Sequence, residues 1–575
     1  MNQPSPAIVP QSAVRRLPRW ALLLLCTAYI LPGFIGRNPW RGADMAALGY
    51  MLELAGDHTP WMAPLLGGLP PETDGMLPYW LGAWAMQLAH PWLAPELAAR
   101  IPFVLLMALA LLATWYAIYA LARSPGAQPV AFAFGGEAQP TDYARAMADG
   151  GLLAFLACLG LAQPSHETTS YLVQLCCTAL VFYGLANGPQ QPKAAAPTVA
   201  LAAGLAGLVL SGAPALAVLF PLGAAALTVL HSTAETADRE SAVRWGMGAL
   251  WLALAAALLA LWLDAWRWKL AWPHEYGKDW WGLARLLVWF AWPAWPLALW
   301  TLWRWRRQIL QRSPHYHLLL PLWFVLIAMV SAAGTLPSDR ALLLGLPALA
   351  TLAAFALPTL RRSMSALIDW FTLLFFSASV IAIWVIWVST QTGVPAKPAA
   401  NVAKLARGFE PQFSATAFAV ALAATLAWCA LVAWRAGRHR SALWKSMVLP
   451  AAGATLCWLL LTTLWLPMLD YVRSDVPQMR TLTRLAGQPA CMHMDGLDRT
   501  QMAALQFHGQ VRLVPLSDAP RCDWLVHAPS TGNAAARSKP LPATDLQGWT
   551  LQHRVDRPRE RSDVLELYLR DAPRD

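Results

Sequence analysis

The stretch IPFVLLMALALLATWYAIYALA, residues 101–122, contains no charged side chain. Its length matches the ~20 apolar residues that a helix needs to cross the hydrocarbon core of a bilayer. Comparable apolar stretches recur along most of the chain, which predicts an all-α polytopic membrane bundle. We expect about thirteen membrane-spanning helices, over residues 20–36, 101–122, 151–164, 169–187, 197–212, 214–231, 245–263, 284–303, 317–333, 341–360, 367–389, 413–434 and 447–467.

The composition of the whole chain supports this prediction. Of its 575 residues, 57% are hydrophobic and 13% are charged, whereas about a quarter of the residues in a soluble domain are charged. The mean hydropathy of +0.41 excludes a soluble enzyme. A net charge of +11 would suggest nucleic-acid binding in a soluble protein. Here the placement of basic residues relative to the membrane explains it better, and we expect no nucleic-acid partner.

Basic residues gather in segments that would lie on one side of the membrane. They are Arg304, Arg306, Arg307 and Arg312, then Arg361 and Arg362, then Arg435, Arg438, Arg440 and Lys445. Because short cytoplasmic loops collect Lys and Arg, this pattern predicts a cytoplasmic N-terminus. An odd number of spans then places the C-terminal region outside, which is the periplasm if the cell is Gram-negative.

The composition changes near residue 468, where apolar stretches shorten and charge rises. We therefore expect a transmembrane domain over residues 1–468 and a small periplasmic α/β domain over residues 469–575. Within the latter, segments 490–493 and 524–527 have the pattern of short strands, around a helix that begins near Thr500.

Cys491 and Cys522 lie in these predicted strands or at their edges. An oxidising compartment favours a disulfide between them. Two unpaired buried thiols are equally compatible with the sequence.

Two long connections are expected between the helices. The outer loop over residues 37–100 is apolar and rich in tryptophan, which predicts short helices in the membrane interface. The polar insert over residues 124–149 is expected to be a flexible cytoplasmic loop without chemistry.

Ionisable residues gather at the predicted outer ends of the helices, where their burial cost makes them functional candidates. They are Asp44 with Arg41; Asp57, His58, Glu72 and Asp74; His166 with Glu167; and Lys269, His274, Glu275, Lys278, Asp279, Asp339 and Arg340. Carboxylates beside Arg and Lys suit a reaction that needs a general base and a clamp for a phosphate leaving group. A lipid-linked sugar phosphate is such a substrate.

Each candidate also has an ordinary structural explanation. Asp44 and Asp74 would serve equally as helix caps or solvated loop residues, and a short turn alone accounts for the pair His166 and Glu167. Arg340 would snorkel to the interface, and Lys269 and Lys278 would be solvated there.

Several local patterns resemble a known family. Residues 56–60, 68–70 and 79–81 are similar to its "SGDWLTP…NGVPYFEKPPLLYWL", and residues 211–214 to its "TKGPV" turn. Residues 289–296 resemble its "LLLGLLPW" helix, and residues 335–347 its "SKLPTYILPLFP". The family is that of the bacterial lipid A aminoarabinose transferases and their protein O-mannosyltransferase relatives, membrane glycosyltransferases of the GT-C class.

The resemblance implies a multi-pass protein of the bacterial inner membrane with thirteen helices and a C-terminal periplasmic α/β domain. It also implies transfer of a sugar from a polyprenyl-phosphate carrier with inversion. The acceptor would be lipid A, another cell-envelope glycan or protein. Asp44 then matches the residue that activates the acceptor, and Glu167 a second acidic residue.

The chain departs from the family at its basic positions. Thr335 replaces the family's phosphate-binding Lys, and we expect Arg340 to take over that role because guanidinium pairs bidentately with phosphate. Thr73 and Asp74 stand where the family has Glu and Lys. That Glu binds a metal in the family, so a divalent metal stays an open possibility here and no cofactor is assigned.

The leading hypothesis is therefore a GT-C glycosyltransferase with Asp44 and Glu167 as catalytic carboxylates, in which Asp44 is the base that activates the acceptor and Glu167 assists. Its expected substrate-binding residues are Arg340, Arg41, Asp74, His166, Lys269 and Lys278. The alternatives are a lipid or glycolipid transporter or flippase, and a catalytically silent lipid-binding relative. A transporter would carry charges at mid-membrane and broken helices in paired halves, whereas here the polar residues concentrate at one face.

Overall fold

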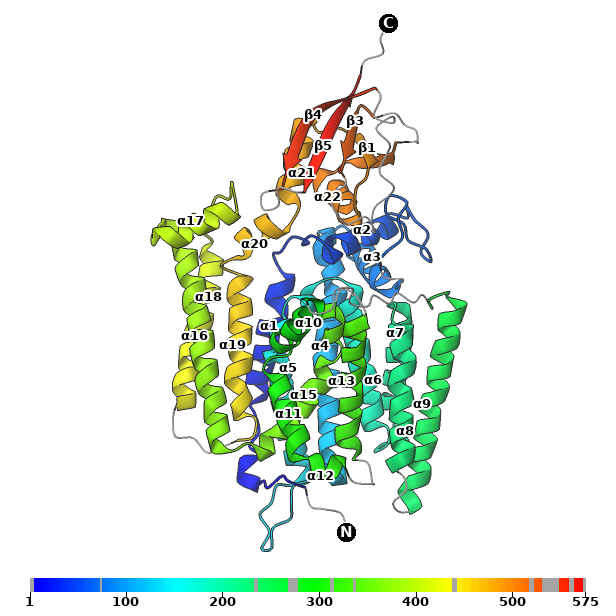
Figure 1. The fold of residues 1–575 in the computed structure, drawn as a ribbon, viewed down its shortest axis with the longest axis vertical. Helices are drawn as coiled ribbons and strands as arrows, with labels where there is room; N and C mark the ends of the chain where they lie inside the picture. The colour runs from blue at the N-terminus through cyan, green and yellow to red at the C-terminus, as the bar shows by residue number, and fades with distance from the viewer. Residues whose placement is uncertain are drawn as a thin grey trace.

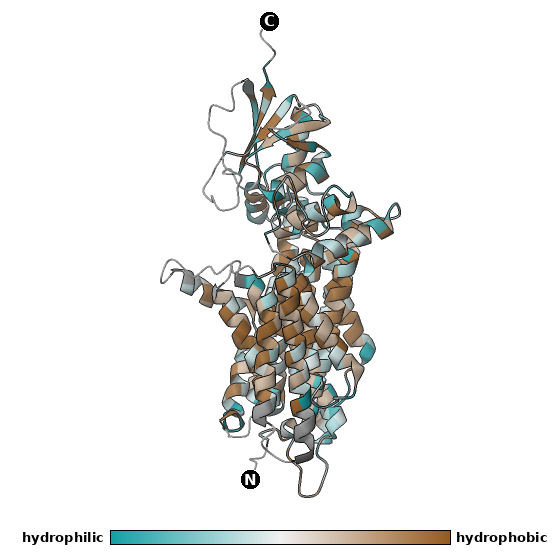
Figure 2. Ribbon diagram, turned by 90° about the vertical axis from the view of Figure 1, so that its right-hand side faces the viewer, coloured by the Kyte–Doolittle hydropathy of each residue, from teal (hydrophilic) through white to brown (hydrophobic). Residues whose placement is uncertain are grey.

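A bundle of helices carries a small sheet domain at one end, and the N-terminal end of the chain lies at the opposite end of the bundle (Figure 1). The computed structural model describes residues 5–72, 75–231, 236–266, 278–310, 315–334, 338–436, 442–516, 522–529, 548–557 and 563–571. The hydrophobic residues form a band across the bundle, whereas hydrophilic residues are frequent at its ends and are mixed with hydrophobic ones in the sheet domain (Figure 2). This distribution is typical of a protein that crosses a bilayer.

Six described helices are long and apolar enough to cross a membrane, and the number rises to nine if each of three bent pairs is one span. The six are α4 (Pro95–Arg123), α6 (Ser170–Asn187), α9 (Thr236–Trp262), α13 (Tyr316–Gly334), α16 (Arg362–Thr392) and α18 (Ala415–Ala436). The bent pairs join α5 (Pro140–Ala157) to η3 (Leu159–Leu161) and η4 (Pro164–His166), α10 (Lys278–Phe290) to α11 (Ala294–Arg304), and α19 (Lys445–Leu461) to α20 (Leu466–Arg473).

Shorter apolar helices complete the bundle: α1 (Arg19–Phe34), α7 (Ala195–Leu210), α8 (Pro214–His231), and α15 (Leu346–Ala356) with η5 (Leu357–Thr359). The expected count of thirteen spans requires that each bent pair is one span and that all of these shorter helices cross as well. It therefore stays a prediction. The remaining short elements are η1 (Gln11–Ala13), η2 (Pro125–Ala127), α12 (Arg306–Ile309), α14 (Ser338–Leu343) and α17 (Ala396–Leu405).

The expectation of a loop through residue 149 is wrong in its second half, because α5 already begins at Pro140. The prediction was wrong because the polar residues of this segment pack inside the protein instead of facing water. Asp149 is buried, and its carboxylate accepts a hydrogen bond from the indole of Trp115 at 2.9 Å.

The loop over residues 37–100 contains two short helices, α2 (Ala43–Ala55) and α3 (Leu77–Ala89), at the end of the bundle nearest the sheet domain (Figure 1). Helix α2 packs against α22 (Arg499–Gly509) of that domain. The approach is close, because a Cβ atom on Gly49 would lie 2.6 Å from the Cβ of Ala503. The helical bundle and the C-terminal domain are thus packed together through α2.

Replacing Gly49 with alanine is expected to destabilise the protein by about 1–2 kcal/mol, because the clash with Ala503 outweighs the gain in helix propensity. Gly248→Ala in α9 is the matched control, since nothing lies within 4 Å of the added Cβ and the substitution should leave stability unchanged or raise it. Thermal unfolding of the purified variants measures both. Equal shifts for the two would contradict the close contact between α2 and α22.

The C-terminal domain contains a five-stranded mixed sheet in the order β2-β1-β3-β5-β4. The strands are β1 (Cys491–Asp495), β2 (Arg512–Pro515), β3 (Trp524–His527), β4 (Trp549–Asp556) and β5 (Val564–Arg570), and α21 (Val476–Leu485) precedes them. Strand β1 is parallel to β2 and β3, and the other neighbours are antiparallel. The crossover from β1 to β2 is α22, whose first turn is capped by the paired side chains of Asp498 and Gln501.

The two expected strands and the helix near Thr500 are present as β1, β3 and α22. Cys491 and Cys522 form a disulfide. Of the two alternatives that the sequence left open, the structure therefore has the cross-link.

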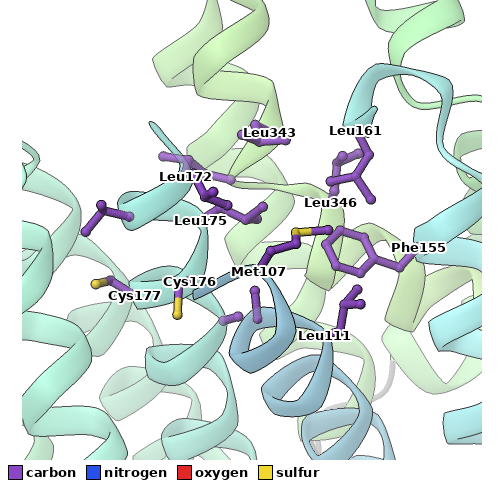
Figure 3. Packing of buried hydrophobic residues seen from close by; sticks show 14 of the residues in the cluster. Met107, Leu111, Phe155, Leu161, Leu172, Leu175, Cys176, Cys177, Leu343 and Leu346 are labelled. Atoms are coloured by element: carbon purple, nitrogen blue, oxygen red, sulfur yellow. The ribbon is translucent and has the colours of Figure 1, made fainter. Parts of the chain in front are cut away.

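The apolar core lies directly beneath the segments that carry the candidate site. Figure 3 shows buried side chains from four of these segments in one cluster: Leu161 of η3, Leu172 of α6, Leu343 of α14 and Leu346 of α15. Met107 and Leu111 of α4 pack among them. This core fixes the positions of the short turns in which the polar residues occur.

Candidate functional site

Glu167 and Arg340, 173 residues apart in the chain, form an ion pair. Glu167 follows η4 directly, three residues before α6 begins at Ser170, and Arg340 lies in the short helix α14. Both side chains are largely buried, at 5% and 13% exposure. Gln163 donates a hydrogen bond to the second carboxylate oxygen of Glu167 at 3.1 Å.

The guanidinium of Arg340 lies over the ring of Tyr171, 5.3 Å from its centroid. Burial lowers the pKa of Arg340, but Glu167 and Asp339 raise it, and the net shift is upward. Arg340 therefore keeps a permanent positive charge at a site that is largely shielded from water.

Asp44, the other expected catalytic acid, is 2% exposed and held by four hydrogen-bonding or charged groups. Its carboxylate pairs with Arg37 at 2.9 Å and accepts hydrogen bonds from the backbone N–H and the hydroxyl of Thr168, both at 2.9 Å. The backbone N–H of Trp40 adds a fourth at 3.2 Å. Because Thr168 follows Glu167 directly, Asp44 and the Glu167–Arg340 pair belong to one network.

Burial raises the pKa of Asp44, whereas Arg37, Arg100 and the hydrogen bonds from Thr168 and Trp40 lower it. The net shift is downward, so the carboxylate stays ionised. Arg37 extends the network, since it also donates to the carbonyl of His166 at 2.8 Å.

His166 lies inside the bundle, at 1% exposure. Its Nε2 faces the carbonyls of Tyr29 and Ile30 at 3.0 and 3.1 Å. Its ring packs against Trp458, with centroids 4.7 Å apart. These contacts tie the η4 turn to α1 and α19.

Arg41 lies at the contact between the outer loop and the C-terminal domain. Its guanidinium pairs with Asp563, and Asp475 and Asp498 lie at 3.8 and 3.7 Å from it. The structure thus places Arg41 among carboxylates of the C-terminal domain rather than beside Arg340.

For three other expected binding residues, the structure does not describe the side chain. Asp74 and Lys269 lie outside the described residues. Lys278 is the first residue of α10, and its side chain is likewise outside the described part.

Residues that the sequence did not single out as site residues connect Glu167 to the C-terminal segments. Arg473, in the last turn of α20, donates to the side-chain oxygen of Gln163 at 2.6 Å. The guanidinium carbons of Arg473 and Arg37 lie 4.9 and 4.6 Å from the ring centroid of Trp40. The indole N–H of Trp40 donates to Asp470 at 2.7 Å. The only signal in the sequence was the RNPWRGAD stretch at residues 37–44, where charge and tryptophan already alternate.

A second missed group comes from α2, α3 and α22. The rings of Tyr50 and Tyr79 are 5.2 Å apart, and Tyr50 donates to the carbonyl of Leu69 at 3.0 Å. Arg499 of α22 donates to the carbonyl of Pro70 at 2.8 Å and lies 3.7 Å from Glu72. Both Glu72 and Tyr79 act electrostatically on Tyr171, which places this group near Arg340.

The residues that the structure describes do not fit a metal centre. Within the described ranges, no group of three or more His, Cys, Asp or Glu side chains is arranged to hold a metal ion. His166 also has its Nε2 directed at backbone carbonyls. We therefore derive no step through a metal.

No protein-family model matches the sequence, and no curated protein matches it. Among solved structures, ArnT from Cupriavidus metallidurans bound to undecaprenyl phosphate is similar, with a TM-score of 0.59 at 15% identity over 96% of this chain and 98% of that chain. The apo state of the same protein has a TM-score of 0.60 at the same identity and coverage. The archaeal oligosaccharyltransferase AglB from Archaeoglobus fulgidus, in complex with an inhibitory peptide and a dolichol-phosphate, has a TM-score of 0.40 at 12% identity, over 76% of this chain and 56% of that chain.

The chain therefore has the fold of ArnT over almost its whole length. The resemblance to the aminoarabinose transferases is confirmed for the fold.

Proposed function

We propose that this protein is a GT-C glycosyltransferase that moves a sugar from a polyprenyl-phosphate carrier to an acceptor outside the cytoplasm. The observation that carries the proposal is the largely buried pair of Glu167 and Arg340. It lies in a chain with the fold of ArnT, a protein that has been solved with undecaprenyl phosphate bound. That similarity supports a polyprenyl-phosphate donor.

Arg340 is the proposed clamp for the phosphate of the carrier. Its charge is fixed, and Tyr171 and Glu167 restrict its orientation. A guanidinium in a partly desolvated site stabilises the negative charge that develops on a leaving phosphate. When the carrier is absent, Glu167 neutralises Arg340.

The proposed reaction is a single displacement with inversion. The acceptor oxygen attacks the anomeric carbon, the bond from that carbon to the phosphate oxygen breaks, and the carrier phosphate leaves with the bonding electrons. The proton of the acceptor passes to a carboxylate. Glu167 is the acid that contacts the phosphate clamp directly, so we assign it this role.

For Asp44 the geometry favours positioning over proton transfer. Both oxygens of its carboxylate are already engaged by Arg37, Thr168 and Trp40. Through Thr168 it fixes the backbone next to Glu167. We propose that His166 and Arg41 likewise hold the segments around the site, while Asp74, Lys269 and Lys278 stay predictions as binding residues.

The proposal predicts that sugar leaves the carrier. Purified protein in vesicles would be incubated with a radiolabelled polyprenyl-phosphate sugar and cell-envelope extract, and label would be followed into lipid A, other glycans and protein. Label that appears in one of these acceptors supports the proposal. Label that stays on the carrier and only crosses the bilayer would indicate a flippase, and label that does not move at all would indicate a silent relative.

A further inference from the structure

An apolar groove of about 850 Å³ runs along the bundle between α1, α18 and α19. Helix α19 packs against both of the others and forms its floor. On α18 the lining includes Ala423, Ala427 and Ala430, whose small side chains leave the space open. Trp20 of α1 lines the same groove and is 71% exposed.

The groove follows α1 and the two residues before it from Leu17 to Ala28, α18 from Ala423 to Trp434, and almost the whole of α19, from Trp444 to Leu459. Its lining residues include none of the residues that contact Glu167 or Arg340, so the groove is separate from the proposed active site. One end of the groove, at Trp444, lies at the end of the bundle where the N-terminal segment lies (Figure 1).

Positive charge gathers at this end of the groove. Lys445 lies with its Nζ 5.2 Å from the ring centroid of Trp434, a residue that lines the groove. Arg15, Arg435 and Asp369 act electrostatically on Lys445, and Asp369 pairs with Arg435. Lys445, Arg15 and Arg435 thus form a cluster of cations beside an apolar surface.

We propose that this groove binds one anionic glycerophospholipid, with its acyl chains along α18 and α19 and its phosphate beside Lys445 and Arg435. The cluster of cations around Lys445 favours an anion, and the apolar lining favours a ligand with long hydrocarbon chains. Basic pockets between membrane helices on the cytoplasmic side recognise anionic headgroups in this way. If the sequence-based topology holds, the lipid belongs to the inner leaflet.

The proposal is tested by native mass spectrometry of the delipidated full-length protein after addition of phosphatidylglycerol or phosphatidylcholine. The wild type should retain one phosphatidylglycerol at least tenfold better than phosphatidylcholine. Ala427→Trp should abolish this retention by filling the groove. Leu426→Trp is the matched control, because Leu426 is 60% exposed on the same helix outside the lining and its replacement should change nothing.

Lys445→Gln should remove the preference for phosphatidylglycerol. Arg306→Gln should keep it, although Arg306 likewise stacks over a tryptophan, with its guanidinium carbon 4.3 Å from the ring centroid of Trp303. Equal retention of both lipids by the wild type, or unchanged retention by Ala427→Trp, would overturn the proposal. Displacement of phosphatidylglycerol by an equimolar polyprenyl phosphate would overturn it too, since the groove would then belong to the carrier. None of these readouts depends on transferase activity.

Discussion

Arg340→Ala is expected to lower sugar transfer by about 10²–10³-fold, measured as kcat with a labelled polyprenyl-phosphate sugar. The loss corresponds to the ~3–4 kcal/mol that one preorganised donor to a developing negative charge contributes in a water-excluded site. Arg340→Lys keeps the charge but loses the bidentate geometry and the planar contact with Tyr171, so we expect it to retain intermediate activity.

The control for this substitution is Arg361→Ala. Arg361 is exposed and precedes α16, outside the network around Glu167. Its replacement should leave kcat within twofold of the wild type. Full activity of Arg340→Ala would remove the phosphate clamp from the mechanism.

Asp44→Ala is expected to destabilise the protein by about 3–5 kcal/mol, because it leaves Arg37 buried without its carboxylate. The same substitution should abolish transfer, since Thr168 and with it the backbone beside Glu167 lose their anchor. Asp44→Asn keeps the shape of the side chain and should destabilise the protein less than Asp44→Ala. Thermal unfolding of the purified full chain measures the first effect and the labelled-sugar assay the second.

Asp57→Asn provides the comparison for Asp44. Asp57 is exposed at the far end of α2, with a positive φ of 53° that asparagine also adopts readily. The Asp57→Asn variant should unfold at the same temperature as the wild type. Wild-type stability of Asp44→Ala would contradict the four-donor environment of Asp44, and lost activity with unchanged stability would instead favour Asp44 as the base.

Long apolar stretches made the helical bundle predictable, because a helix that faces lipid must be apolar over a length that the bilayer sets. The strands around Cys491 and Trp524 were predictable for a similar reason, as short alternating or apolar segments between polar ones. Residues 140–149 were mispredicted because a helix end that packs polar groups inside the protein has the composition of a loop.

The candidate site was only partly predictable. Asp44, Glu167 and Arg340 could be selected as costly charges near helix ends, but their partners come from distant segments. Thr168 is 124 residues from Asp44, and Arg473 is 310 residues from Gln163. No local pattern encodes such contacts, because they depend on how bent helices pack.

The central claim, that Arg340 holds the carrier phosphate, is tested most directly by the binding of undecaprenyl phosphate to purified protein. We predict that Arg340→Gln raises its Kd at least tenfold and that Arg361→Gln leaves it unchanged. Equal affinity of Arg340→Gln and the wild type would contradict the account.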